Sequence, residues 1–226
     1  MKTACALTIA GSDSGGGAGV QADLKTFASL KVHGLTVITA LTAQNTKRVE
    51  GTFDVPTDFI AKQLDAVASD FEIKWAKTGM ISSKEIIREV VIGIEKHEIK
   101  LVMDPVMVAS SGDALIKEDA VEELKTLIKI AEIVTPNIPE AEKLSGVKIN
   151  DLESMEKAAR AIFELGPKAV LIKGGHMEGD EVVDLLLSNG EIKIFKGPRV
   201  TGGSVHGTGC TFAAAITAEL AKGANL

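Results

Sequence analysis

The sequence predicts a three-layer α/β/α fold, in which helices cover both faces of a mostly parallel sheet. Short apolar segments alternate along the chain with segments whose apolar residues recur every three or four positions, and this alternation is typical of successive βαβ units. An Asn-Gly pair at residues 189–190, between two strand-like segments, further predicts an antiparallel hairpin at one sheet edge. No repeat or low-complexity linker divides the 226 residues, so we expect a single domain over residues 1–226.

The expected strands are short apolar runs bounded by glycine or polar residues. In chain order they span residues 5–10, 36–40, 73–78, 101–104, 133–135 and 169–173, followed by the hairpin strands 181–187 and 192–195. The helices between them carry apolar residues at three- and four-residue spacing, which predicts one face packed on the sheet. They span residues 20–30, 58–68, 84–96, 120–129 and 154–165, and a helix rich in small residues follows at 212–220.

Residues at the helix ends are consistent with these ranges. A short polar residue with Glu three positions later predicts a capped helix start, and the candidate pairs are Ser82 with Glu85 and Asn150 with Glu153. Glycine after a helix supplies a left-handed residue that ends it, and the candidates are Gly34, Gly146 and Gly166.

The composition excludes several classes of function. Lys and Arg number 25 against 31 Asp and Glu, and aromatic residues make up 4%, so a nucleic-acid partner is not expected. No apolar run approaches the roughly 20 residues of a membrane span, and no secretory leader is visible, so we expect a cytoplasmic protein without a membrane partner. Cys5 and Cys210 are the two cysteines, too few for a disulfide scaffold or a cysteine-based zinc site.

A glycine-rich turn follows the first expected strand, at residues 11–19 (GSDSGGGAG). Ligands of open parallel sheets bind beyond the carboxyl ends of the strands, and the free N–H groups of the next helix could meet an anion or polar ligand there. The alternative is a turn that only packs a helix tightly on a strand. The stretch 17–22 fits the loose dinucleotide pattern, but residues 36–43 hold no carboxylate for a ribose, which disfavours a nicotinamide-dependent oxidoreductase.

A second glycine-rich segment, Val205 to Thr211 (VHGTGCT), precedes the last helix. The backbone N–H groups of Gly207, Thr208 and Gly209 could converge on a phosphoryl group, with the helix dipole adding positive potential. A thiol in a first helical turn is expected to have a pKa below its free value of about 8.5, so Cys210 is a candidate base or nucleophile. The alternative for Cys210 is a small buried apolar residue.

Polar side chains follow several other expected strands. Asp104, Asn137, Glu140 and Lys173 stand where a nucleotide and its metal would need carboxylates and an ammonium, and Asp104 and Glu140 are the candidate Mg²⁺ ligands. Glu140 could instead be a first-turn helix carboxylate, and Lys173 a solvated strand end. No Walker sequence is present. Gln44 could recognise a heterocycle with donors and acceptors, or simply occupy a turn.

Taken together, these motifs resemble hydroxymethylpyrimidine/phosphomethylpyrimidine kinases of the ribokinase-like superfamily. The resemblance runs through the chain in unchanged order: AGSDSGGGAGVQAD at 10–23, TALTAQNT at 39–46, TGM at 78–80, DPV at 104–106, TPN at 135–137, KGGH at 173–176 and HGTGCT at 206–211. It implies a ribokinase-like fold and ATP-dependent phosphorylation of 4-amino-5-hydroxymethyl-2-methylpyrimidine and of its monophosphate in thiamine biosynthesis. The implied ligands are the pyrimidine, ATP and Mg²⁺.

The resemblance also implies roles for individual residues. Gln44 would hydrogen-bond the aminopyrimidine, and the Cys210 thiolate would take the proton of the hydroxymethyl group. The γ-phosphoryl group would be held by the backbone of residues 207–209. The pyrimidine-pocket residues of the family correspond here to Gly11, Asp23, Met80 and Val106. The nucleotide-binding residues of the family correspond to Asp104, Asn137, Glu140 and Lys173.

The chain departs from the family pattern in two places. It ends at Leu226, where the usual C-terminal helices that help wall the adenine site would follow, and residues 201–205 lack an expected Lys-Asn pair. Some relatives carry a thiamine-phosphate-forming domain, so the expected partners are a fused domain and a second copy of the chain that covers exposed apolar surface in a homodimer. The alternatives are a pyridoxal kinase activity and a pyrimidine-binding domain without turnover.

Overall fold

The computed structural model describes residues 3–109, 112–113, 115–176, 179–200 and 206–226. In these residues the strands form one sheet of order β3-β2-β1-β4-β5-β6-β7-β8-β9. The strands are β1 (Cys5–Asp13), β2 (His33–Gln44), β3 (Val49–Asp54), β4 (Trp75–Thr78), β5 (Lys100–Met103), β6 (Ile133–Val134), β7 (Ala169–Ile172), β8 (Glu181–Ser188) and β9 (Glu191–Pro198).

The sheet is parallel from β2 through β7 and antiparallel at both edges. The pairs β7 with β8 and β8 with β9 form the expected edge hairpin. On the other side, β3 pairs antiparallel to β2. This strand was not expected from the sequence, because every residue of β3 is exposed or half-buried and the segment lacks an apolar face. The predicted mostly parallel sheet is confirmed, with one more antiparallel edge than expected.

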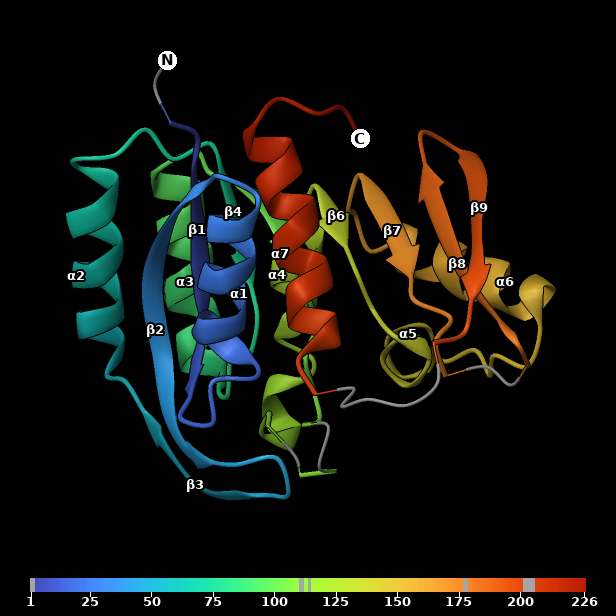
Figure 1. The fold of residues 1–226 in the computed structure, drawn as a ribbon, viewed down its shortest axis with the longest axis horizontal. Helices are drawn as coiled ribbons and strands as arrows, with labels where there is room; N and C mark the ends of the chain where they lie inside the picture. Colours follow the sequence, from blue (N-terminus) through green and yellow to red (C-terminus); the bar gives the residue numbers. More distant parts are fainter. Residues whose placement is uncertain (1–2, 110–111, 114, 177–178, 201–205) are drawn as a thin grey trace.

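Helices cover both faces of the sheet, which confirms the three-layer prediction (Figure 1). On one face lie α1 (Gly19–Ser29) and α7 (Thr208–Ala221), which pack on each other. The other face carries α2 (Thr57–Ala68), α3 (Lys84–Lys96), α4 (Leu124–Ile130), α5 (Ile138–Ser145) and α6 (Leu152–Phe163). The expected helix 120–129 begins only at Leu124, after a short 3₁₀ turn, and α5 was not among the expected helices.

Two of the expected caps are displaced by one residue. Ser83, rather than Ser82, accepts the hydrogen bond from the Ile86 N–H at the start of α3. Asp151, rather than Asn150, starts α6, where it forms a capping box with Ser154. In both places the neighbouring polar residue has the correct backbone position to accept from the third helical N–H.

Left-handed glycines end helices at two of the three expected positions. Gly146 has φ of 72° and Gly166 has φ of 114°. Gly34 instead lies inside β2, paired with Ala6, and the left-handed residue after α1 is Lys31 with φ of 62°. The chain therefore turns three residues earlier than the glycine indicated.

Small side chains allow α7 to lie close to the centre of the sheet. Ala213 packs with Trp75 and Val102, and Ala214 packs with Ala6 and Phe27, all of them buried. The helix begins at the edge where the parallel strands end and runs back across the sheet (Figure 1). Its first turn is thereby placed at the carboxyl ends of β1, β4 and β5. Among the described residues, no helix has the length and apolar character of a membrane span.

Candidate active site

The two glycine-rich segments predicted from the sequence meet at the carboxyl edge of the sheet. Asp13 Oδ2 lies 2.9 Å from Nε2 of His206, which directly precedes α7. Gly207 has φ of 81°, and a Cβ at this position would overlap the carbonyl oxygen of Gly17. Only glycine satisfies both the left-handed backbone and this close approach. The turn before α1 and the turn before α7 therefore form one continuous surface.

Asp13 organises the first glycine-rich turn. Its carboxylate accepts hydrogen bonds from the N–H groups of Gly15, Gly17 and Ala18, at 2.8, 3.0 and 2.8 Å. Burial alone would raise its pKa, but the contact with His206 and the three N–H donors outweigh burial and hold the pKa of Asp13 below its usual value. The ionised carboxylate thus fixes a loop that has almost no side chains of its own.

The same turn is joined to Gln44. The Ser14 hydroxyl donates to the Gln44 carbonyl oxygen and accepts from the Gln44 N–H, both at 2.8 Å. The Gln44 side chain is half-buried, and its Oε1 accepts a hydrogen bond of 3.1 Å from Thr42. The turn before α1 therefore links Gln44 at one end to Gly207 at the other, as a site with a heterocycle next to a phosphoryl group requires.

Gly11, Met80 and Val106 lie at neighbouring strand ends. A Cβ at Gly11 would lie 3.0 Å from the Met80 sulfur, so the absence of a side chain makes room for Met80. Thr39 donates to the Met80 carbonyl oxygen at 2.8 Å. Val106 is half-buried and follows Asp104, to whose carbonyl oxygen it donates at 2.8 Å. The structure thus places these three candidate pocket residues at the carboxyl edge.

Asp23 is placed differently from the expectation. Its side chain is fully buried, accepts 3.0 and 3.1 Å hydrogen bonds from Lys77 Nζ, and accepts a 2.6 Å bond from Thr8. The structure thus places Asp23 in an ion pair beneath the site, and the pocket role expected for it stays a prediction. The sequence did not indicate a role for Lys77, the partner of Asp23. The only unusual feature of Lys77 there is that it is a cation within an apolar strand.

Cys210 lies in the first turn of α7, but its thiol does not have the lowered pKa expected from the sequence. Burial raises the pKa of Cys210 above its usual value, and Asp104 and Asp23 add to the increase. Lys77 is the largest opposing influence, and the Gly19 N–H also favours the thiolate. The helix start alone suggested a lowered pKa because the loss of water around the sulfur is not visible in the sequence.

Lys173 and Asp104 form a second ion pair, next to the start of α7. Lys173 Nζ lies 2.9 Å from Asp104 Oδ1, and their side chains are 15% and 2% exposed, which excludes the solvated strand end considered for Lys173. A Cβ at Gly209 would lie 3.5 Å from Lys173 Nζ and 3.8 Å from Asp104 Oδ2. The expected anion-binding segment therefore lies directly against a buried ammonium and carboxylate.

Asn137 and Glu140 form a capping box at the start of α5. The Asn137 side chain accepts from the Glu140 N–H at 2.9 Å, and the Glu140 carboxylate accepts from the Asn137 N–H at 2.8 Å. Burial and the neighbouring Asp104 raise the pKa of Glu140 to about 7, although Lys173 acts in the opposite direction. Glu140 is therefore the first-turn carboxylate considered from the sequence, and it also lies within electrostatic reach of the Lys173–Asp104 pair.

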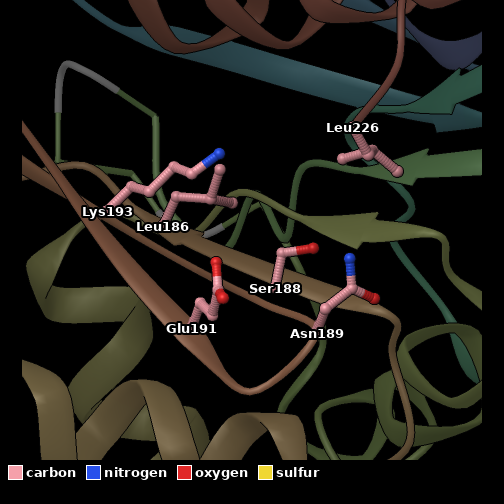
Figure 2. A pocket seen from close by; sticks show the side chains of 6 residues that line it. All are labelled: Leu186, Ser188, Asn189, Glu191, Lys193 and Leu226. Atoms are coloured by element: carbon pink, nitrogen blue, oxygen red, sulfur yellow. The ribbon is translucent and has the colours of Figure 1, made fainter.

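A small pocket elsewhere on the molecule does not belong to this site. It is lined by Leu186, Ser188, Asn189, Glu191, Lys193 and Leu226 (Figure 2). Ser188 pairs with Ala169, the first residue of β7, so the pocket lies at the amino edge of the sheet. The catalytic groups gather at the opposite edge.

Comparisons with known proteins show the family of the chain. Residues 13–226 match the family model described as phosphomethylpyrimidine kinase. The chain is 49% identical over 226 residues to the hydroxymethylpyrimidine/phosphomethylpyrimidine kinase of Rhizobium meliloti, covering 99% of this chain and 85% of that protein. It is 51% identical over 219 residues to the thiamine biosynthesis bifunctional protein ThiED of Geobacter sulfurreducens, covering 96% of this chain but only 45% of that longer protein.

Solved structures show the same fold. The phosphomethylpyrimidine kinase of Clostridium difficile 630 superposes with a TM-score of 0.87 at 46% identity, covering 98% of this chain and 92% of that one. The pyridoxal kinase of Staphylococcus aureus, solved with AMP-PCP and pyridoxal, superposes with a TM-score of 0.89 at 37% identity, covering 100% and 82%.

Proposed function

Since the chain belongs to the phosphomethylpyrimidine kinase family, we propose that it transfers the γ-phosphoryl group of ATP to 4-amino-5-hydroxymethyl-2-methylpyrimidine and then to the monophosphate. The two-part name of its relatives indicates both transfers, and the bifunctional relative is named for thiamine biosynthesis. The observation that carries the proposal is the position of the glycine segment before Cys210, which adjoins the Lys173–Asp104 pair on one side and the turn joined to Gln44 on the other.

In the first transfer, the Cys210 thiolate takes the proton of the hydroxymethyl group. The hydroxymethyl oxygen bonds to the γ-phosphorus while the bond from that phosphorus to the β–γ bridging oxygen breaks, and ADP leaves with the electron pair. Backbone N–H groups of residues 207–209 donate to the oxygens of the transferring group. The Cys210 thiol then loses its proton to solvent, which restores the base.

The second transfer makes a smaller demand on Cys210. Its nucleophile is an oxygen of the pyrimidine monophosphate, whose second pKa is near 6, so it is already ionised at neutral pH. Positioning by the glycine segment and Lys173 then suffices, because phosphoryl transfer depends mainly on orientation and charge stabilisation.

The residues at the nucleotide side fit ATP with Mg²⁺. Within the described residues no cluster of three or more His, Cys, Asp or Glu could hold a metal alone. Nucleotide-bound Mg²⁺ needs only one or two protein carboxylates besides phosphate oxygens and water, and Asp104 and Glu140 would provide these. When bound, Mg²⁺ would neutralise charge on the phosphates. Lys173 and Asn137 would contact the same nucleotide.

On the pyrimidine side we propose Gln44 as the residue that recognises the aminopyrimidine. Its amide provides both a donor and an acceptor, which matches a ring with an amino group and ring nitrogens. Gly11, Met80 and Val106 would border the ring. Asp23 is left out of this contact set because it is enclosed with Lys77.

A pyridoxal kinase activity is the second candidate, because the Staphylococcus aureus pyridoxal kinase shares the fold at 37% identity over the whole chain. Steady-state assays with ATP, Mg²⁺ and each vitamin precursor separate the two. We expect kcat/KM for the hydroxymethylpyrimidine to exceed that for pyridoxal. Single-turnover assays that gave no phosphorylated product from either compound would instead indicate a binding domain without turnover.

We also propose that residues 1–226 act as one ribokinase-like domain that forms a homodimer and, in bifunctional relatives, is joined to a second enzyme. The single continuous sheet of the described residues supports the single domain, and the 45% coverage of the bifunctional relative supports the joined second enzyme. Sedimentation equilibrium of the chain tests the dimer, since a monomer mass at all concentrations would contradict it.

A further inference from the structure

Lys77 and Asp23 form an ion pair that the proposed chemistry does not use. Both side chains are 0% exposed, and Nζ lies 3.0 and 3.1 Å from the two carboxylate oxygens. Burying two charges costs free energy that their attraction often fails to recover, so such a pair is weak evidence for a purely stabilising role. The pair also sits in β4 and α1, two elements that border the site.

The position of Lys77 relative to Cys210 follows from the two elements that carry these residues, β4 and α7, which pack on each other. On α7, Cys210 lies one helical turn before Ala214, on the same side of the helix that packs on the sheet. On β4, Lys77 lies two residues after Trp75, on the sheet face that meets Ala213. Helix α7 starts at the carboxyl edge of the sheet (Figure 1) and contacts β4, so the side of α7 that carries Cys210 faces the side of β4 that carries Lys77. Nζ of Lys77 also lies 3.2 Å from where Gly79 would carry a Cβ.

We propose that Lys77 is a positioning residue for the first phosphoryl transfer, in which its ammonium, held by Asp23, stabilises the Cys210 thiolate. The inference deepens the proposed function and rests on it, since the role matters only if Cys210 accepts a proton. Asp23 and the Thr8 hydroxyl keep the long side chain of Lys77 in one conformation. The glycine at 79 leaves the space that the ammonium occupies.

The groups with the largest influence on the pKa of Cys210 act in opposite directions. Burial and the carboxylates of Asp104 and Asp23 raise the pKa of the thiol, while Lys77 is the strongest group that lowers it. Asp23 and Cys210 in turn raise the pKa of Lys77 above its usual value, which keeps the ammonium charged in spite of burial. The Cys210 thiolate also contributes to raising the pKa of Lys173, at the end of β7. Among these groups, Lys77 is the one whose removal should shift the thiol most.

The experiment measures the Cys210 thiol directly. In a Cys5→Ser background one thiol remains, so its ionisation is followed by ultraviolet thiolate absorbance and by the pH dependence of alkylation with iodoacetamide, in nucleotide-free protein. We expect Lys77→Met to raise the thiol pKa by about one unit or more, because a nearby opposite charge is lost. The matched control is Thr8→Val, which removes one hydrogen bond from the same buried pair but no charge, and it should shift the thiol pKa much less than Lys77→Met does.

Kinetics provide the second readout. In Lys77→Met, the rate of the first transfer should fall at neutral pH and recover as pH rises, whereas the second transfer should change little. A purely structural defect would lower both transfers at every pH. If Lys77→Met does not fold, Lys77→Met/Asp23→Asn removes both charges, and its thiol pKa should still rise because Lys77 affects the thiol more than Asp23 does.

An unchanged thiol pKa in the folded Lys77 variants would overturn the inference. Failure of the proposed function has a different signature. Full activity of Cys210→Ala in the first transfer would remove the base role, while the thiol titration would still report whether Lys77 acts on the sulfur.

Discussion

Asp13 Oδ2 lies 2.9 Å from His206 Nε2, and this contact joins two segments 193 residues apart in the chain. Asp13 belongs to the turn that contacts Gln44, and His206 precedes the glycine segment before Cys210. The proposed pyrimidine side and the proposed phosphoryl side of the site are thereby fixed to each other.

Asp13→Asn should weaken this connection and lower stability in a pH-dependent way. The pKa of Asp13 is held below 3.8, so its ionised form contributes stability that is present above that value and lost as pH falls through the folded pKa. We expect a loss of about 1–3 kcal/mol at neutral pH, since three N–H donors lose a charged acceptor. Urea unfolding at neutral and acid pH checks this, and the two proteins should converge at acid pH.

Cys210→Ala should separate the two phosphoryl transfers. Loss of a general base costs about 10²–10⁴-fold in rate where a proton must be removed. The first transfer should show this loss in kcat with little change in KM for the pyrimidine, and the second transfer should be much less affected. Rapid-quench assays started from the pyrimidine and from its monophosphate measure each step, and equal losses in both would contradict a role as base.

Glu140→Gln should stabilise the metal-free, nucleotide-free protein at and above neutral pH. Because the folded pKa is raised from 4.5 to about 7, the stability that Glu140 provides is complete below 4.5 and is lost as pH rises through about 7. The difference reaches about 3 kcal/mol as an upper limit. Gln preserves the acceptor for the Asn137 N–H, so the cap is kept.

Unfolding titrations at several pH values test this prediction, and a stability gain that does not depend on pH would argue against it. The same variant should require more Mg²⁺ for half-maximal activity, because one carboxylate ligand is removed. Glu142→Gln is a comparison variant on the same helix: its half-buried carboxylate pairs with Lys148, and its pKa is held below the usual value, so this variant should show the opposite pH dependence.

Gly207→Ala should reduce activity through backbone geometry. The residue has φ of 81°, and an added Cβ overlaps the Gly17 carbonyl oxygen, so the turn before α7 must shift. We expect a loss of about 1–3 kcal/mol in stability and a lower kcat for both transfers, since the N–H donors move together. Gly197→Ala, where a Cβ meets no atom within 4 Å, is the control. Thermal unfolding and steady-state kinetics of the pair give the comparison.

Periodicity in the sequence was sufficient to predict the layers and most elements, because buried parallel strands and amphipathic helices have distinct patterns. It missed β3, whose residues are exposed or half-buried, and α5, which is short and begins next to Pro139. The glycine segments, Gln44 and the strand-end groups were found from their local chemistry.

Other properties depend on neighbours that are distant in sequence. The enclosure of Asp23 by Lys77 and the raised pKa of Cys210 arise only when β4, α1 and α7 pack together. The order of residues in the sequence does not show how much water a particular atom loses when the chain folds. The enclosure of Asp23 and the raised pKa of Cys210 are therefore properties of the candidate site that the sequence pattern did not predict.

The contact between Asp13 and His206 has a practical consequence for ligand screening. It joins β1, at the middle of the sheet, to the start of α7, so compounds that bind between them are coupled to unfolding of the whole molecule rather than of a single loop. A ligand at 100 times its Kd adds about 2.7 kcal/mol to the folded state. Melting temperatures recorded with pyrimidine, pyridoxal and nucleotide analogues therefore rank these compounds without any turnover.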